Sequence, residues 1–357
     1  MTWLPRATDV FVIGGGPAGL AAAIAARRRG LDVTVADWSE IPINKACGEG
    51  IMPDGVAAAE ALGIPLGHSG ALAFSGIRFV SGGVSVEARF PSGAGLGLRR
   101  TTLHSLMARR AAEAGVSMVW GARVSGIRPE GVVADGRLVR ARWVVGADGG
   151  NSQVRRWARL EATAGHSRRF GFRRHYRLAP WSEFVEIHWG EACQLYITPV
   201  EASEICVVRI SRDPHLRLDD ALPQFPEVWR RLAGAGVTDA ERGGVSSMCR
   251  LRRVYRGNVA LVGDASGSVD AITGEGLCLL FQQAQALAAA FETGDLSRYQ
   301  AAHRRVGRRP ELMANLMLLL DRRTRLRRVT IRVLAASPRL FAQLLAFHVG
   351  APQIVAT

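Results

Sequence analysis

Lysine is almost absent from this chain of 357 residues, in which Lys45 is the single lysine beside 45 arginines. The formal net charge is +15. Because arginine supplies nearly all of the positive charge, this excess reflects a bias in residue usage as much as a basic binding surface. Nucleic-acid recognition would also need an aromatic or glycine-rich reader motif beside the charge, and the sequence contains none. We therefore expect no nucleic-acid partner.

Cysteine is also scarce, and its pattern argues against two classes of protein. The five cysteines are Cys47, Cys193, Cys206, Cys249 and Cys278. An odd number of widely spaced cysteines without a CxxC pair suggests neither a disulfide framework nor a zinc site, and fits a reducing compartment. No run reaches the roughly 18 uninterrupted apolar residues that span a bilayer. We expect a cytoplasmic protein without a metal site.

What the chain does contain is an opening pattern of strand, glycine turn, helix and strand. Residues 9–13 (DVFVI) are a short β-branched run, 14–19 (GGGPAG) a turn, 20–29 an alanine-rich helix and 31–37 (LDVTVAD) a second buried strand. In this order a glycine turn brings the backbone to a pyrophosphate at the free N–H groups of a helix N-terminus. The pattern predicts a bound dinucleotide.

Each residue of the turn has an expected task. Gly14 allows the sharp turn, Gly16 lets the backbone approach the pyrophosphate, and Gly19 permits close packing of the helix on the strand. Ala18 lies in the same turn and is included among the expected cofactor contacts. Asp37, at the end of the second strand, is placed to accept hydrogen bonds from an adenosine ribose.

Two later strands end in pairs of glycine and aspartate. One runs into 146–149 (GADG), and the strand 259–262 is followed by Asp264, a loop and a long helix from about Gly274. With the first glycine turn, these segments resemble the three fingerprints of the FAD-dependent oxidoreductases of the para-hydroxybenzoate hydroxylase superfamily: GxGxxG, a central DG and a late GD. The resemblance implies an FAD cofactor.

The resemblance also implies individual contacts with FAD. Asp264 would hold a ribityl hydroxyl, while Gly276 and Leu277 would offer backbone N–H groups of a helix N-terminus to the flavin ring, which stabilises an electron-rich reduced flavin. Arg100 and Asp148 match further cofactor contacts of the family. Three alternatives stay open: a helix N-cap for Asp264, a loop brace for Asp148 and a surface position for Arg100.

A second nucleotide site is not found. The glycines of 92–100 (SGAGLGLRR) lack a preceding strand and helix unit, so we interpret them as a loop. NAD(P)H is therefore expected only as a transient electron donor at the flavin. Val124 completes the expected FAD contacts.

The segment 43–53 (INKACGEGIMP) indicates a branch of the superfamily. It resembles the [KR]-x-C-[AG]-E-G segment of geranylgeranyl reductases, which packs against the isoalloxazine. The segment 269–276 (VDAITGEG) is similar to VDPxTGEG of the same branch, with Ala271 where proline is usual. This branch is the nearest relative that the sequence identifies.

The first of these segments supplies the catalytic candidates. Lys45 places a compact ammonium near the flavin, and Gly48 and Gly50 are expected to contact the cofactor. Cys47 is either a proton donor or a small apolar residue that packs on the ring. Glu49 is either a general acid or a brace for the helix that follows.

The stretch 166–253 alternates apolar and polar residues and predicts an antiparallel sheet. In the superfamily such a sheet covers the flavin and lines the substrate pocket, so Tyr176, His188 and Tyr196 are the candidate substrate contacts. The segment 194–200 (QLYITPV) departs from the YxWxFP of geranylgeranyl reductases. This departure puts a prenyl substrate in doubt.

The C-terminal part is helical and rich in arginine, interleaved with leucine. One interpretation is a surface that makes peripheral contact with anionic lipid and admits apolar substrates. The other, which we favour at this point, is a cap whose arginines are solvated and whose leucines pack on the FAD domain. The arginines are Arg304, Arg305, Arg308, Arg309, Arg322, Arg323, Arg325, Arg327 and Arg328.

These observations predict an α/β fold in which an FAD-binding Rossmann-like domain carries an inserted antiparallel β-sheet substrate domain and a C-terminal helical cap. The expected boundaries are 1–160 for the first part of the FAD domain, with a small β excursion near 70–98, 161–253 for the substrate domain, 254–300 for the second part of the FAD domain and 301–357 for the cap.

Two reactions fit this outline. We expect an NAD(P)H-driven monooxygenase that hydroxylates an apolar aromatic or polyketide-like small molecule. The alternative is a geranylgeranyl reductase-like flavoprotein that reduces carbon–carbon double bonds of a prenyl or other lipid substrate. A flavin-loaded binding or sensor protein is a third reading, which substrate-dependent NAD(P)H oxidation would exclude.

Overall fold

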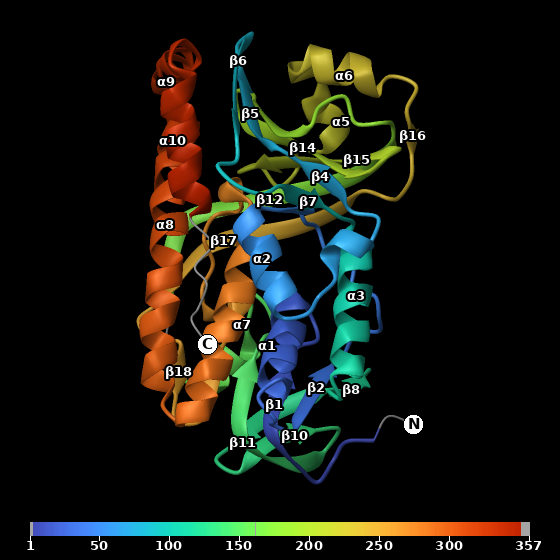
Figure 1. The fold of residues 1–357 in the computed structure, drawn as a ribbon, viewed down its shortest axis with the longest axis vertical. Coiled ribbons are helices and arrows are strands. Elements are labelled where there is room, and N and C mark those ends of the chain that lie inside the picture. The colour runs from blue at the N-terminus through green and yellow to red at the C-terminus, as the bar shows by residue number, and fades with distance from the viewer. Residues whose placement is uncertain (1–2, 161, 351–357) are drawn as a thin grey trace.

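The computed structural model of the chain describes residues 3–160 and 162–350. A mixed sheet with a parallel centre at one end and a second large sheet at the other are joined by the helices between them, and three C-terminal helices run along one side (Figure 1). This arrangement confirms the expected α/β class. Residues 351–357 of the expected cap lie outside the described residues.

The first sheet has β1 at its centre, hydrogen-bonded in parallel to β2 on one side and β11 on the other. Helices α1 and α3 and the long helix α7 pack on one face, so these strands are buried and apolar, as is usual for parallel sheets. The strands are β1 (Ala7–Ile13), β2 (Val33–Asp37), β8 (Ser117–Trp120), β9 (Val124–Arg128), β10 (Gly131–Ala134), β11 (Arg137–Gly146), β18 (Tyr255–Arg256) and β19 (Val259–Leu261). The helices are α1 (Pro17–Arg27), α3 (Arg100–Glu113), α4 (Gln153–Trp157) and α7 (Gly276–Thr293).

The second sheet is the expected substrate sheet, and it is larger than the sequence predicts. Two strands from the excursion near 70–98 join its edge, because β13 pairs in parallel with β5 and β5 pairs with β6. Its strands are β5 (Gly76–Ser81), β6 (Val84–Arg89), β12 (Ala162–Arg177), β13 (Phe184–Trp189), β14 (Cys193–Glu201), β15 (Glu204–Ser211), β16 (Gly236–Val237) and β17 (Arg242–Leu251).

Both faces of the second sheet are covered. Short helices α5 (Leu218–Ala221) and α6 (Pro226–Leu232) close what we call the outer face. The inner face shares the main core with α1, α7 and the C-terminal helices. Because side chains alternate along a strand, β14 contributes to both faces: Leu195 packs in the outer cluster and Tyr196 in the main core.

Short elements join the two large sheets. A three-stranded sheet contains β3 (Gly50–Ile51), β4 (Leu72–Phe74) and β7 (Gly95–Gly97), and α2 (Pro53–Ala61) follows β3. The remaining short helices are η1 (Leu66–His68), η2 (Leu222–Gln224), η3 (Gly263–Ser266) and η4 (Ala271–Thr273). As a result, the segment with Cys47 lies between the two halves of the molecule.

Helices α8 (Leu296–Arg322), α9 (Thr324–Ala336) and α10 (Pro338–Val349) form the C-terminal part. Because α8 is continuous through residue 300, the expected boundary between FAD domain and cap falls inside a helix. In the described part of the chain no single helix is long and apolar enough to cross a membrane, whereas α9 and α10 pass that test only together and are bent by 107°.

Candidate functional site

The first glycine turn has the backbone that its sequence requires. Gly14 has a φ of +110°, and a Cβ there would lie 2.5 Å from the Ala147 carbonyl oxygen. A Cβ on Gly19 would lie 1.8 Å from the Gly14 oxygen, so only glycine allows this approach of α1 to β1. Gly16 has open space where its Cβ would be. The expected sharp turn and close packing are confirmed, and the space at Gly16 fits a pyrophosphate.

Two side chains hold this turn from other elements. Asp37 Oδ2 accepts a hydrogen bond from Gly15 N at 2.7 Å. His104, on α3, contacts the Gly15 carbonyl oxygen through Nε2 at 2.9 Å. Burial lowers the pKa of His104, so the imidazole that contacts the turn is neutral near pH 7. The sequence gives no sign of this role for His104, because a histidine inside an amphipathic helix has no distinguishing pattern.

In the second fingerprint, the two carboxylate oxygens of Asp148 have different roles. Asp148 Oδ2 accepts hydrogen bonds from Gln153 N and Val154 N at 2.6 and 3.1 Å, which braces the start of α4. Its Oδ1 is buried and has no partner among the described residues. Arg155, which the sequence did not single out, donates to Gly150 O at 2.7 Å and Ala265 O at 3.3 Å. It thereby ties the second fingerprint to the third.

Asp264 is exposed, and its carboxylate makes no hydrogen bond to the described residues. The helix-cap alternative is therefore wrong. Protein packed around it raises the pKa of the Asp264 carboxyl by desolvation, and the charges of Arg100 and Lys45 act in the opposite direction. Lys45 also lies beside the second fingerprint, since a Cβ on Gly149 would be 4.0 Å from Lys45 Nζ.

The beginning of α7 is open as the flavin role requires. Gly276 is its first residue and has open space where its Cβ would be, and Leu277 follows it inside the core. Glu275, the N-cap residue, makes no side-chain capping hydrogen bond. The N–H groups of this first turn are thus free to meet a ligand.

The donor set fits FAD. Open space at the glycines of three segments, free helix N-termini and polar atoms without partners surround one region, as a dinucleotide with phosphates and a ribityl chain needs. Arg100 Nε and Asp148 Oδ1 are two of the buried atoms that have no hydrogen-bond partner in the described part of the chain. Val124 begins β9, next to Ala122, whose N–H donates to Asp37 O at 3.0 Å. Asp264, Asp148, Arg100 and Lys45 are the charged residues that would hold the cofactor.

Glu49 is the most constrained acid of the site. Its side chain is fully buried, and its φ is +59°. Oε1 accepts from Arg173 Nη1 at 2.6 Å and from Arg100 N at 3.0 Å, and Oε2 lies 2.6 Å from His175 Nε2. Glu49 therefore braces the start of α3. The expectation that it braces the following helix α2 is wrong, because the cap of α2 carries no side-chain hydrogen bond.

The partners of Glu49 come from the substrate sheet. Arg173 and His175 lie on β12 with side chains 1% exposed, and both reach Asp239, at 2.8 and 3.0 Å. Glu49, His175 and Cys206 bring possible metal ligands within 4.8 Å of one another, but the Arg173 guanidinium already neutralises Glu49. Sequence reasoning missed Arg173 and His175, because charged residues in a strand are usually solvated.

Cys47 and Cys206 lie on either side of Glu49 and differ in access. Cys47 is half-buried, and its Sγ accepts a hydrogen bond from Glu49 N at 3.4 Å. Cys206 is fully buried, and burial raises the pKa of its thiol well above the usual range. Gly48 has open space where its Cβ would be, whereas Gly50 pairs in β3. Cys47 is the thiol that a ligand beside this segment can reach.

The three candidate substrate residues lie on opposite faces of the sheet. Tyr196 is on the inner face and donates its hydroxyl to Ile272 O at 2.7 Å, which ties β14 to the 269–276 segment. Tyr176 belongs to the outer cluster, and His188 packs against Phe225 of that cluster. The expectation that Tyr176 and His188 line the same pocket as Tyr196 is wrong.

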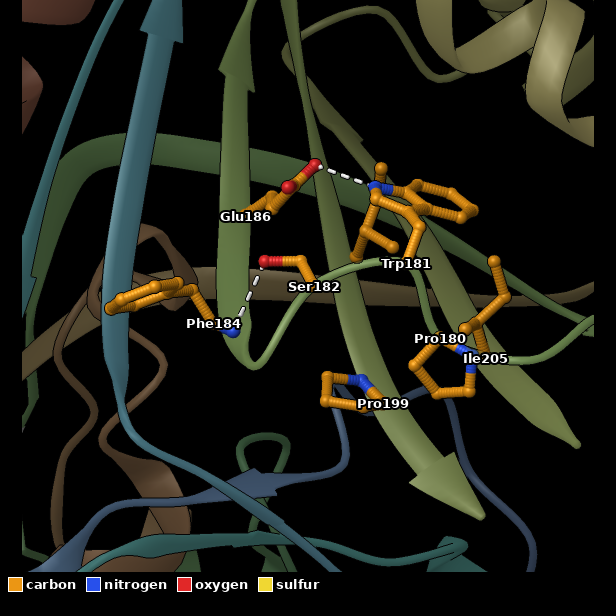
Figure 2. Close-up of a pocket in the computed structure, with 8 residues that line it drawn as sticks. Pro180, Trp181, Ser182, Phe184, Glu186, Pro199 and Ile205 are labelled. Carbon is orange, nitrogen blue, oxygen red and sulfur yellow. Dashed lines mark hydrogen bonds between the residues drawn. The ribbon is translucent and has the colours of Figure 1, made fainter. Parts of the chain in front are cut away.

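A small pocket opens on the outer face (Figure 2). Glu186 accepts a hydrogen bond from Trp181 there at 3.1 Å, and also contacts His188 at 2.9 Å. The volume of about 170 Å³ is below the roughly 300 Å³ from which ligand pockets start. Because it is separated from the fingerprint loops by the sheet, this pocket is not part of the site.

The first prediction compares two glycines of one turn. Gly16→Ala should leave the thermal stability of the FAD-free protein unchanged, since its φ of −68° suits alanine, and should weaken FAD binding. Gly19→Ala should lower the melting temperature of the same FAD-free protein, because its Cβ overlaps backbone. Thermal unfolding and FAD titration measure both, and equal FAD affinity of Gly16→Ala and wild type would contradict the assignment.

The second prediction concerns the buried carboxylate. Glu49→Gln should destabilise the protein by about 3 kcal/mol, because Arg173 and His175 lose a buried countercharge. The control is Glu292→Gln, which breaks an exposed ion pair with Arg29 and should change stability little. Urea unfolding measures both, and similar values for the two variants would show that Glu49 is not a structural anchor.

A family comparison agrees with this geometry. The family described as "FAD binding domain" matches residues 7–294, which include all three fingerprints. Among solved structures, a flavin-dependent brominase superposes with a TM-score of 0.83 at 18% identity, covering 97% of this chain and 94% of its own. At that identity the likeness concerns the fold.

Curated relatives include reductases and monooxygenases. Menaquinone reductase of Mycobacterium tuberculosis is 28% identical, covering 81% of this chain and 78% of the relative. Digeranylgeranylglycerophospholipid reductase 2 of Methanopyrus kandleri is 30% identical, covering 75% and 73%. The 6-methylpretetramide 4-monooxygenase of Streptomyces rimosus is 35% identical, covering 42% and 40%. The chain therefore belongs to the FAD-binding-domain family of hydroxylase-type flavoproteins and is an FAD-dependent oxidoreductase.

Proposed function

We propose that this protein is a reductase that uses FAD to saturate carbon–carbon double bonds in the chain of an isoprenoid lipid. The observation that carries the proposal is the extent of similarity. Two of the reductases match three quarters or more of the chain, whereas the match to the 6-methylpretetramide monooxygenase covers 42%. Because substrate choice resides outside the FAD-binding segments, the longer matches bear more directly on the reaction.

The reaction needs a hydride and a proton delivered to the two carbons of the double bond. FAD in its reduced form supplies the hydride when bound. The proton comes from a group of the protein, the π bond is lost and two C–H bonds form. The electrons enter from NAD(P)H, which we propose as a transient donor.

We propose Cys47 as the group that donates this proton. It is half-buried, whereas Cys206 beside it is closed off. The Glu49 N–H points at the Cys47 sulfur and helps to orient its side chain. Glu49 itself has its carboxylate held by Arg173 and His175, so it positions the segment and does not serve as the acid.

The positive charges of the site have a second role. Lys45 and Arg100 both act on Asp264, and they offset the negative charge of Asp148 and Asp264. The positive end of α7 beside them favours the electron-rich reduced flavin. The inner face of the second sheet is apolar, with Phe79 packed against the buried rings of Trp189 and Phe341.

Hydroxylation of an apolar ring is the second candidate. Its support is the higher identity, 35%, to a monooxygenase over part of the chain. Hydroxylation needs a pocket that is closed to water, and it needs no proton-donating side chain such as Cys47. The two candidates therefore differ in their need for Cys47 and for oxygen.

The third prediction separates these reactions. Reduced protein mixed without oxygen with a geranylgeranyl lipid should give product heavier by two hydrogens per double bond. Under labelled oxygen no label should enter the product. Label in a hydroxylated product, together with no anaerobic saturation, would overturn the reductase proposal in favour of the second candidate.

The fourth prediction tests the proton donor. Cys47→Ala should lower the rate of saturation roughly 10²- to 10⁴-fold, the usual scale of general acid catalysis, while FAD stays bound. Cys193→Ala, a buried cysteine of the outer cluster, is the matched control and should keep the rate within a factor of about three. Full activity of Cys47→Ala would remove Cys47 from this role.

A further inference from the structure

The C-terminal helices expose an unusual share of the apolar surface. Eight of the fifteen large apolar side chains that are exposed among the described residues lie on α8, α9 and α10. They are Leu312, Leu316, Leu319, Leu326, Val329, Val333, Leu340 and Phe347, and we call them the exposed stripe. An apolar patch of this kind on an otherwise folded protein marks an interaction site.

The stripe is separate from the face that holds the helices on the protein. Leu326, Val329 and Val333 recur at helical spacing on α9, whereas Ile331 and Leu334 of the same helix are buried in the main core. The expectation that the leucines of this region pack on the FAD domain therefore holds for α8, which packs on α7, whereas α9 and α10 pack on β5 and β6 of the second sheet. On the other face Phe347 meets the guanidinium of Arg309, and the apolar side chains of the exposed stripe remain open to solvent.

The charge around the stripe has one sign. From Leu296 to Val349 the sequence has twelve arginines and two acids, Glu311 and Asp321. On α9 the exposed Arg325, Arg328 and Arg332 lie one position before the apolar residues, so a row of guanidinium groups runs beside the stripe. A helix with this pattern lies in the plane of a membrane interface.

Buried ion pairs hold the helices that carry the stripe. Asp321, near the end of α8, accepts hydrogen bonds from Arg169 and Gln194 of the substrate sheet and from Arg212. On α9, Arg327 is 2% exposed and donates to Gly190 O at 2.9 Å. Asp321 and the buried cations thus serve the interior, Glu311 pairs with Arg250, and the exposed Arg325, Arg328 and Arg332 are left for a partner.

We propose that the exposed stripe and its arginines dock the protein on the surface of an anionic lipid bilayer, without crossing it. The bend of 107° between α9 and α10 suits helices that lie on a surface. A second copy of this chain is the less suitable occupant, because two such faces would bring like charges together. Lipid phosphates supply the opposite charge and acyl chains cover the leucines.

The docked surface is connected to the site through α10. His348 Nδ1, on the inner side of α10, lies 3.5 Å from Glu275 Oε1 at the start of α7. Delivery of a lipid from the bilayer to this region rests on the proposed reductase function, whereas docking itself does not. The two can therefore fail independently.

The experiment is flotation of the FAD-loaded full chain with phosphatidylcholine vesicles that contain either no phosphatidylglycerol or about one third of it. We expect binding to the anionic vesicles that falls steeply with salt, and little binding to the neutral ones. The combined change Arg325→Gln, Arg328→Gln and Arg332→Gln should weaken binding roughly 100-fold, at about fivefold for each arginine.

The matched control removes three exposed arginines from the opposite end of the molecule, in Arg128→Gln, Arg137→Gln and Arg140→Gln, and should leave binding within a factor of about three. The combined change Leu326→Ser, Val329→Ser and Val333→Ser should abolish flotation while the flavin spectrum and melting temperature are kept.

Each outcome decides the proposal. The proposal would be overturned if the Arg128 control variant lost as much vesicle binding as the Arg325 variant, or if the wild-type protein did not float with anionic vesicles. Wild-type self-association that the serine set abolishes, without flotation, would assign the stripe to a second copy instead. Flotation without saturation of a geranylgeranyl lipid would reject the reductase function and retain the docking surface.

Discussion

The buried carboxylate of Glu49 is the interaction on which the site depends. It joins Arg173 and His175 of the substrate sheet to the start of α3 and to the segment that carries Cys47. A fully buried charge is tolerated only when partners surround it, so this contact fixes how the two halves of the molecule meet. It also explains why Glu49, although it lies in a motif next to the FAD region, serves as a structural anchor.

The fingerprint loops are likewise held by a few side chains from outside the motifs. Arg155 bridges the second and third fingerprints, and His104 supports the first from α3. Within the part of the chain that the structure describes, these contacts leave the Asp264 carboxylate and Oδ1 of Asp148 without a hydrogen-bond partner. The loops are thus held by residues outside the motifs, while the motif residues stay available for FAD.

The substrate side follows from the same assembly. The C-terminal helices cover the inner face of the sheet with one side and present leucines and arginines with the other. The apolar and basic surface of the C-terminal helices suits anionic lipids as a partner, and a lipid with a long chain is the substrate of the proposed reaction. The proposed reaction and the proposed docking surface are therefore chemically consistent, although they rest on separate observations.

The sequence by itself determined the features that depend on neighbouring residues: the turn at Gly14, the close packing at Gly19, the strand ending at Asp37 and the position of Asp264 after its strand. Only the tertiary structure decided which sheet face Tyr176 and His188 occupy, because helices cover both faces and an alternating pattern no longer distinguishes them. The role of Glu49 was decided in the same way, since its partners on β12 are more than 120 residues away along the chain, and local patterns carry no information on such long-range ion pairs.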